Sequence, residues 1–205
     1  MTCLVSEFIQ YGALYDILHS KEERMELSWF LMAKFVKDAA SALSYLHQFE
    51  PPLIHRDVKS SNLLLVSLDE SEAVECNVKL CDFGTAREVS TNMTGSQGTT
   101  LWMSPEVFCG TSYSIKADIW GLGIVIGEMA TRKPPWSEIS YWDALVKVKE
   151  GEAPPIEEEK TPPIIFSLWR QCLSKDPSKR PFAGDIGRII SDNLFILKES
   201  GGTVK

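Results

Sequence analysis

An ordered series of short polar motifs constrains the fold of this 205-residue chain more than any other feature. The first motif is the run Ile54-His55-Arg56-Asp57-Val58-Lys59-Ser60-Ser61-Asn62-Leu63-Leu64. Asp82-Phe83-Gly84 begins twenty residues after Asn62, and Pro105-Glu106 comes later in the chain. Any one of these motifs could be an ordinary polar turn, but all of them in this order form a far more specific signal.

Hydrophobic periodicity predicts a mainly helical chain with a few short strands. Ser28 is a residue type typical of helix N-caps, and apolar residues recur at helical spacing from Trp29 to about residue 49. Further helices are predicted at about 14–19, 117–130, 141–150, 163–174 and 184–198. Short strands are predicted at 3–9, 53–54, 63–66 and 78–80, and the polar segment 67–77 joins the last two as a hairpin.

The motif series resembles the catalytic core of the eukaryotic protein kinases, where H-R-D, Asn, D-F-G and P-E occur in this order. The resemblance covers nearly the whole chain and implies an α+β protein-kinase-like fold over residues 1–198. It places the last small-lobe strand and the hinge at 1–9, and a mainly helical large lobe with short β-hairpins at 10–198. Residues 199–205 are predicted to be a flexible tail.

The resemblance assigns chemical roles to four side chains of the motifs. Asp57 matches the base that accepts the proton of the attacking hydroxyl, and Lys59 is placed to reach the transferred phosphoryl group. Asn62 and Asp82 offer hard oxygen ligands, which suit Mg²⁺. The implied reaction is phosphoryl transfer from Mg-ATP to a serine or threonine hydroxyl of a protein substrate.

The resemblance also places the nucleotide. Glu7 and Ile9 would offer backbone groups to the adenine ring, and Leu64 matches the apolar residue beneath it. A core leucine on a strand explains Leu64 equally well. Lys59 and Asp82 complete the set of residues predicted to contact ATP.

Other matches to the family imply contacts that support the site. Asp118 would hold the backbone of the catalytic loop, and Arg180 would pair with Glu106. Thr99 would touch Asp57 and Lys59, which is the serine/threonine arrangement. The Trp102-Met103 pair, the turn at 12–18 and Pro51-Pro52 are similar to the tyrosine-kinase-like group of serine/threonine kinases.

Three parts of the kinase core do not occur in the 205 residues: the glycine-rich loop, the strand lysine and the glutamate-bearing helix. We therefore expect a kinase domain truncated at the N-terminus, with the small β-rich lobe mostly absent. The alternative is a non-catalytic kinase-like module that binds a partner. The presence of Asp57, Lys59, Asn62 and Asp82 favours the enzyme, whereas the missing lobe favours the module for the chain as given.

Composition argues against several other classes. The net charge is -7, which disfavours a nucleic-acid partner. The longest apolar stretch, 119–130, contains Glu128 and is shorter than the roughly 20 residues that a membrane span needs. The five cysteines form no C-x-x-C pair, which argues against a disulfide framework or zinc site and favours a reducing, cytoplasmic compartment.

The segment 84–104 has no hydrophobic period and is rich in Ser, Thr and Gly, which indicates a long loop. Phosphorylation within it could order the loop by pairing with Arg56, or its hydroxyls could be ordinary polar loop residues. The candidate positions are Ser90, Thr91, Thr94 and Ser96.

Residues 1–205 alone are predicted to transfer phosphate poorly, because positioning supplies most of the catalysis of phosphoryl transfer. Without a cover for the phosphates, most of that gain is lost. The measurement is the Mg-ATP affinity of the purified chain and its transfer of phosphate to a generic protein substrate. Micromolar binding with steady turnover would contradict the prediction.

Overall fold

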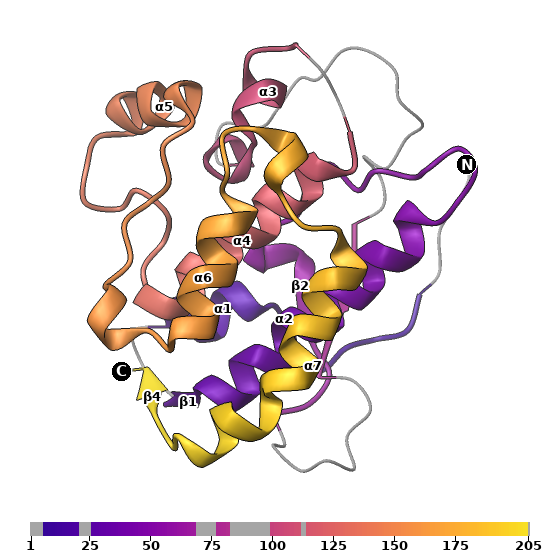
Figure 1. Cartoon of the computed structure of the whole chain (residues 1–205), viewed down its shortest axis with the longest axis vertical. Helices are drawn as coiled ribbons and strands as arrows, with labels where there is room; N and C mark the ends of the chain where they lie inside the picture. Colours follow the sequence, from indigo (N-terminus) through magenta and orange to yellow (C-terminus); the bar gives the residue numbers. More distant parts are fainter. Residues whose placement is uncertain (1–5, 21–25, 69–76, 83–98, 112–113, 205) are drawn as a thin grey trace.

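The computed structural model describes residues 6–20, 26–68, 77–82, 99–111 and 114–204. These residues form a helical body with two short antiparallel sheets (Figure 1). The α-helices are α1 (Leu14–His19), α2 (Trp29–His47), α3 (Pro105–Phe108), α4 (Lys116–Thr131), α5 (Tyr141–Glu150), α6 (Pro163–Cys172) and α7 (Ala183–Glu199). The 3₁₀ turns are η1 (Ser60–Asn62), η3 (Thr99–Trp102), η4 (Glu158–Lys160) and η5 (Pro177–Lys179). The strands are β1 (Leu27–Ser28), β2 (Leu63–Leu65), β3 (Val78–Leu80) and β4 (Thr203–Val204).

The two longest helices, α2 and α7, pack against each other, whereas α5 lies at the periphery (Figure 1). The hydroxyl of Ser28 accepts the Leu31 N–H at 3.0 Å, so the predicted N-cap of α2 is confirmed. Phe35 and Leu43 of α2 and Ile186 and Ile190 of α7 are all fully buried. The apolar faces of both helices therefore contribute to one core.

Helix α4 runs through the interior, and every residue from Asp118 to Met129 is buried. A helix that is apolar around most of its circumference is typical of such a position. Gly121 lets α4 approach the loop at 55–62, which resembles the catalytic loop of protein kinases, because a Cβ at this position would lie 2.7 Å from the Val58 carbonyl oxygen. Since that contact is with backbone, a larger residue would have to displace the loop.

The predicted hairpin is confirmed. Strands β2 and β3 are antiparallel, with Leu63 opposite Leu80 and Leu65 opposite Val78. A carboxylate oxygen of Asp38 on α2 accepts the backbone N–H groups of Asn77 and Val78 at 2.7 and 3.3 Å. The hairpin is thereby attached to the helix that precedes the catalytic loop.

The strand predicted at 53–54 is wrong, and so is the part of the strand predicted at 3–9 that lies at 6–9. Residues 1–5 lie outside the described residues, but residues 6–9 are irregular, and the Phe8 side chain is 91% exposed instead of buried. The segment 53–54 forms no strand and has only a single bridge at Ile54. Its backbone hydrogen-bonds to a helix and not to a strand, because the Leu53 N–H donates to the Leu46 carbonyl at the end of α2.

The prediction of a flexible tail at 199–205 is wrong for residues 202–204. Strand β4 pairs with β1, placing Val204 opposite Leu27. The Gly202 carbonyl also accepts the Trp29 N–H at 3.1 Å, which satisfies one of the free N–H groups in the first turn of α2. Backbone pairing thus orders a segment whose side chains carry no strong structural signal.

The predicted helices at 14–19 and 141–150 are confirmed, and α5 ends at Gly151 in a left-handed conformation with φ of 69°. The ends of the other long helices differ from the predictions by one or two residues. No described helix combines the length and the apolar character needed to cross a bilayer. The four hydroxyls of the predicted regulatory loop lie in 83–98, outside the described residues.

Arg180 forms the predicted ion pair with Glu106, and its side chain is fully buried. Its Nη1 and Nη2 atoms donate to the two Glu106 carboxylate oxygens at 2.6 and 2.8 Å. Further bonds go to the carbonyls of Ser174 and Lys116. Burial raises the pKa of Glu106, but hydrogen bonding and charge attraction from Arg180 outweigh it, so the pKa lies below its ordinary value.

Glu106→Gln is expected to lower the free energy of unfolding by about 3–5 kcal/mol, because it leaves the Arg180 charge buried and uncompensated. The difference in the free energy of unfolding between variant and wild type should have its largest value above about pH 4.5. It should vanish as the pH falls through the lowered pKa of Glu106, because the wild-type side chain is then also uncharged. Urea unfolding across this pH range is the measurement. The matched control is Glu138→Gln, which removes an exposed pair with Lys133 and should leave the midpoint unchanged. Equal midpoints for both variants would contradict the expectation.

Candidate active site

The catalytic loop at 55–62 is held at its start by Asp118, at the first turn of α4. The two Asp118 carboxylate oxygens accept the backbone N–H groups of His55 and Arg56 at 2.9 and 2.8 Å. His47 at the end of α2 contacts the same carboxylate at 2.8 Å. Arg56 has a φ of 71°, a conformation that costs free energy for a non-glycine residue. The role predicted for Asp118 in holding this backbone is confirmed.

Asp57 is oriented by two neighbours within the same loop. Its Oδ2 atom accepts a hydrogen bond from the Asn62 side-chain amide at 3.0 Å and lies 2.8 Å from Lys59 Nζ. Its Oδ1 atom is buried and has no hydrogen-bond partner among the described residues. One carboxylate oxygen is therefore held by Lys59 and Asn62, while the other has no partner in the part of the chain that the structure describes.

Lys59 connects the catalytic loop to the turn η3. Its ammonium group donates to the Thr99 hydroxyl at 2.9 Å, as well as contacting Asp57. The predicted contact between Thr99 and Lys59 is confirmed. The loop and the turn that follows the 83–98 segment are thus joined at the reacting end of the site.

The hairpin register brings Asn62 and Asp82 to the same end of β2 and β3. Asn62 directly precedes β2, and its carbonyl accepts the Cys81 N–H at 2.9 Å, which extends the ladder beyond β3. Asp82 is the next residue, with a φ of 63°. The Asn62 amide nitrogen also donates to the Asp57 carbonyl at 2.8 Å, so its oxygen is the atom left for a ligand.

A two-residue oxygen set at this end fits a metal that is carried by a nucleotide. Mg²⁺ is usually held by one or two protein groups together with phosphate oxygens and water, not by a complete protein cage. Consistent with this, the described residues contain no group of three or more His, Cys, Asp or Glu side chains placed to hold a metal. Asn62 and Asp82 are the residues that would hold the ion.

The residues predicted to face adenine lie along the hairpin. Leu64 is half-buried, pairs with Ala13 through a single bridge, and stands opposite Lys79 in the register. Cross-strand partners share a face, so Leu64 and Lys79 project to the same side of the hairpin. Lys79 forms an ion pair of 2.5 Å with Glu7. Ile9, which lies between Glu7 and Ala13 in the sequence, is half-buried. The segment 7–13 therefore contacts the hairpin near both ends of the segment, through Glu7 and Ala13.

Cys81 lies between these two parts of the site and is half-buried. Burial raises the pKa of its thiol, the carboxylates of Asp82 and Asp57 raise it further, and Lys59 opposes them only in part. Its carbonyl contacts His55 Nε2 at 3.0 Å. The thiol therefore remains protonated at neutral pH, which disfavours a nucleophilic role.

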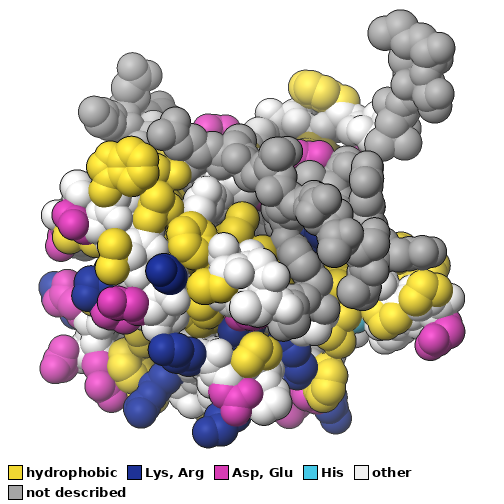
Figure 2. All heavy atoms as spheres, turned by 90° about the horizontal axis from the view of Figure 1, so that it is seen from above, with side chains coloured by type: hydrophobic (Ala, Val, Ile, Leu, Met, Phe, Trp, Pro, Cys, Tyr) yellow, Lys and Arg dark blue, Asp and Glu magenta, His cyan; other side chains and the backbone are white. Residues whose placement is uncertain are grey.

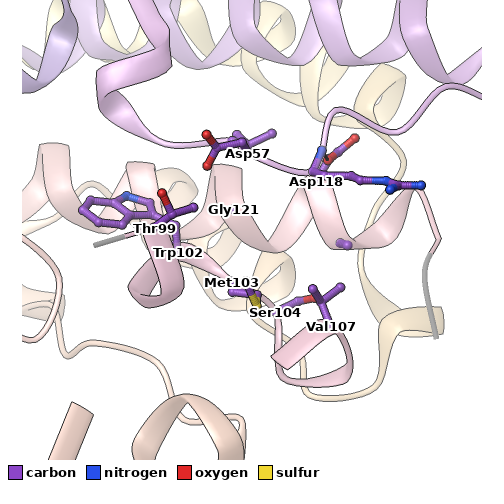
Figure 3. A pocket seen from close by; sticks show the side chains of 11 residues that line it. Asp57, Thr99, Trp102, Met103, Ser104, Val107, Asp118 and Gly121 are labelled. Atoms are coloured by element: carbon purple, nitrogen blue, oxygen red, sulfur yellow. Dashed lines mark hydrogen bonds between the residues drawn. The ribbon is translucent and has the colours of Figure 1, made fainter. Parts of the chain in front are cut away.

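A small pocket lies beneath the catalytic loop, between that loop, η3, α3 and α4 (Figure 3). Asp57 and Asp118 lie above it, and Met103, Ser104 and Val107 lie below it (Figure 3). Its volume of about 20 Å³ is room for a single water molecule. The pocket is therefore too small to hold a nucleotide.

The sequence predictions missed a buried acid of the site, Glu128, which is 2% exposed. Its carboxylate accepts hydrogen bonds from His19, Ser60 and Trp102. The sequence did contain a signal, because Glu128 is the one acid within the apolar stretch 119–130. A carboxylate in a buried helix needs several hydrogen-bond donors, so its position there indicates that other segments supply them.

Comparison with known proteins identifies the family. The model of the protein kinase domain matches residues 1–188, so the chain belongs to the protein kinase family. It is 38% identical to mitogen-activated protein kinase kinase kinase 7 of Bos taurus over 192 residues, covering 92% of this chain and 32% of that protein. It is also 38% identical to the probable serine/threonine-protein kinase drkA of Dictyostelium discoideum over 182 residues, covering 87% of this chain and 27% of that protein. The chain thus spans about a third of the length of the curated relatives it matches.

Asp118→Asn should loosen the start of the catalytic loop. Asparagine has one acceptor oxygen, so one of the two backbone N–H groups at His55 and Arg56 loses its partner, at a cost of about 1–3 kcal/mol. Amide hydrogen exchange in 54–58 should accelerate, with a matching loss in urea stability. Asp192→Asn on the exposed side of α7 is the control. Unchanged exchange at Arg56 would show that the carboxylate does not hold the loop.

Proposed function

We propose that this chain is the large lobe and hinge of a Mg-ATP-dependent protein serine/threonine kinase of the tyrosine-kinase-like group. The observation that carries the proposal is the state of Asp57. One of its oxygens is held by Lys59 and Asn62, while Oδ1 is buried without a partner among the described residues. A buried carboxylate oxygen without a hydrogen bond costs free energy, so we expect it to serve a function. A substrate hydroxyl could donate a hydrogen bond to it.

The charges around Asp57 suit that task. Bound Mg-ATP would supply the phosphoryl group and the metal charge. Oδ1 of Asp57 orients the attacking hydroxyl and accepts its proton, while Lys59, 2.8 Å from Oδ2, offers positive charge toward the transferred group. Thr99 limits the positions that the Lys59 ammonium can adopt. The work of these residues is positioning and electrostatics, as phosphoryl transfer requires.

A protein is the proposed substrate, and the surface supports that class. In the described part of the face in Figure 2, acidic and basic side chains are interspersed with hydrophobic ones. Such a surface does not favour a polyanion there. The names of the relatives, a kinase of protein kinases and a serine/threonine-protein kinase, support a serine or threonine hydroxyl of a protein as acceptor.

The second candidate is a non-catalytic kinase-like module that binds a partner protein. Its support is the exposure of Phe8, at 91%, beside the exposed Tyr11 on the segment that leads into α1. Exposed aromatic side chains are typical of protein interfaces. A module of this kind has no need of an oriented Asp57, so the two candidates differ in the effect of changing that residue.

Asp57→Asn is expected to lower turnover by about two to four orders of magnitude, because the amide cannot accept the hydroxyl proton. The KM for ATP should change little, since the variant keeps the shape of the side chain. The assay is transfer of labelled phosphate to a generic protein substrate by the gene product at its full natural length. Asp192→Asn is the control. Transfer by Asp57→Asn at the rate of that control would refute the proposed role, and no transfer by wild type would favour the binding module.

A further inference from the structure

Glu128 joins three segments that are distant in the sequence. Its Oε1 atom accepts hydrogen bonds from His19 Nε2 and Ser60 Oγ, both at 2.8 Å, and its Oε2 atom accepts one from Trp102 Nε1 at 2.9 Å. The donors belong to α1, to η1 in the catalytic loop, and to η3. The Glu128 side chain is fully buried. A carboxylate in such surroundings is stable only while its donors stay in place.

Two of the three donors, Ser60 and Trp102, are close in sequence to residues predicted at or beside the site. Ser60 directly follows Lys59 and belongs to the same 3₁₀ turn as Asn62. Trp102 lies three residues after Thr99 in η3, and residues i and i+3 of a 3₁₀ turn share a face. Anchoring the Trp102 indole on α4 therefore fixes the side of η3 from which Thr99 reaches Lys59.

The position of His19 adds the helix that follows the hinge segment to this arrangement. Its Nε2 donates to Glu128, while Nδ1 is buried without a hydrogen-bond partner among the described residues. The tautomer with the proton on Nε2 fits this geometry. Nε2 can then donate to Glu128, and Nδ1 carries a lone pair, which costs less free energy to bury without a partner than an N–H group does. The carboxylate then accepts hydrogen bonds from three donors.

We propose that Glu128 is a positioning residue for the proposed phosphotransfer reaction, and that its hydrogen bond from Trp102 sets Thr99 and Lys59 in register with Asp57. The inference rests on the proposed function. Glu128 contacts no predicted substrate or nucleotide group; it acts through Ser60 on the catalytic loop and through Trp102 on η3. It thus complements Asp118, which holds the other end of the loop from the first turn of the same helix.

Trp102→Phe is the sharpest test. Glu128→Ala would leave three donors buried without an acceptor and could prevent folding, whereas phenylalanine keeps an aromatic ring and removes only one donor. Trp169→Phe is the matched control, because the Trp169 indole N–H is buried without a partner among the described residues. Both changes remove a similar volume, but only the change at Trp102 removes a hydrogen bond to Glu128.

In the full-length gene product, Trp102→Phe is expected to lower kcat with a protein substrate about tenfold or more and to leave the KM for ATP within about twofold. A shift of reacting groups by about 1 Å is enough for such a loss. Trp169→Phe should keep the wild-type kcat. Equal kcat values for the two folded variants would overturn the proposal, since loss of packing alone predicts similar effects at both sites.

Amide hydrogen exchange on the 205-residue chain gives a readout that does not depend on activity. Exchange in 99–104 and 59–63 should accelerate in Trp102→Phe and stay at the wild-type rate in Trp169→Phe. If wild type shows no phosphotransfer, the proposed function fails, and exchange alone decides whether Glu128 couples these segments. Unchanged exchange in both segments would overturn the coupling even in an active enzyme.

Discussion

The catalytic loop depends on two buried carboxylates carried by a single helix. Asp118, in the first turn of α4, accepts the backbone N–H groups at the start of the loop, and Glu128, toward the other end of the helix, accepts the Ser60 hydroxyl. These residues are ten positions apart, or about 15 Å along a helix. Because α4 is surrounded by the core, both acceptors are fixed before any substrate arrives, and the loop between them takes its shape from the helix.

Burying charge in this way is costly, and the structure offsets the cost with hydrogen bonds instead of exposure to water. Asp118 and Glu128 each have three donors, and the buried Arg180 guanidinium is bonded to Glu106 and to two carbonyls. Each network joins segments from different parts of the chain. Asp57 Oδ1 differs, because it has no partner among the described residues. The acids that support the loop thus have hydrogen bonds to their carboxylate oxygens, whereas the acid that is expected to react keeps one oxygen without such a bond.

What could be predicted from the sequence was local or was carried by motifs. Ser28 caps α2 and Gly151 ends α5 through interactions within one or two turns, so residue type alone was informative. The contacts of Asp118 and Arg180 followed from the resemblance. The pairing of β4 with β1 was missed because two-residue strands have no periodicity, and their backbone bonds do not depend on residue type. Glu128 was missed because its donors come from three separate segments. The roles of Asp57, Lys59, Asn62 and Asp82 in catalysis, and of Glu7, Ile9 and Leu64 in nucleotide binding, stay predictions.

The pairing of β1 with β4 has a consequence for how the chain is made on the ribosome. Residues 27–28 are synthesised 175 residues before the second residue pair of this sheet, 203–204. Until then the edge of β1 and the first N–H groups of α2 lack these partners, so a nascent chain carries an open backbone edge beside the apolar Trp29. Chaperone binding to nascent chains should therefore persist until residues 203–204 leave the exit tunnel, although α2 and the loop at 55–62 have long been synthesised.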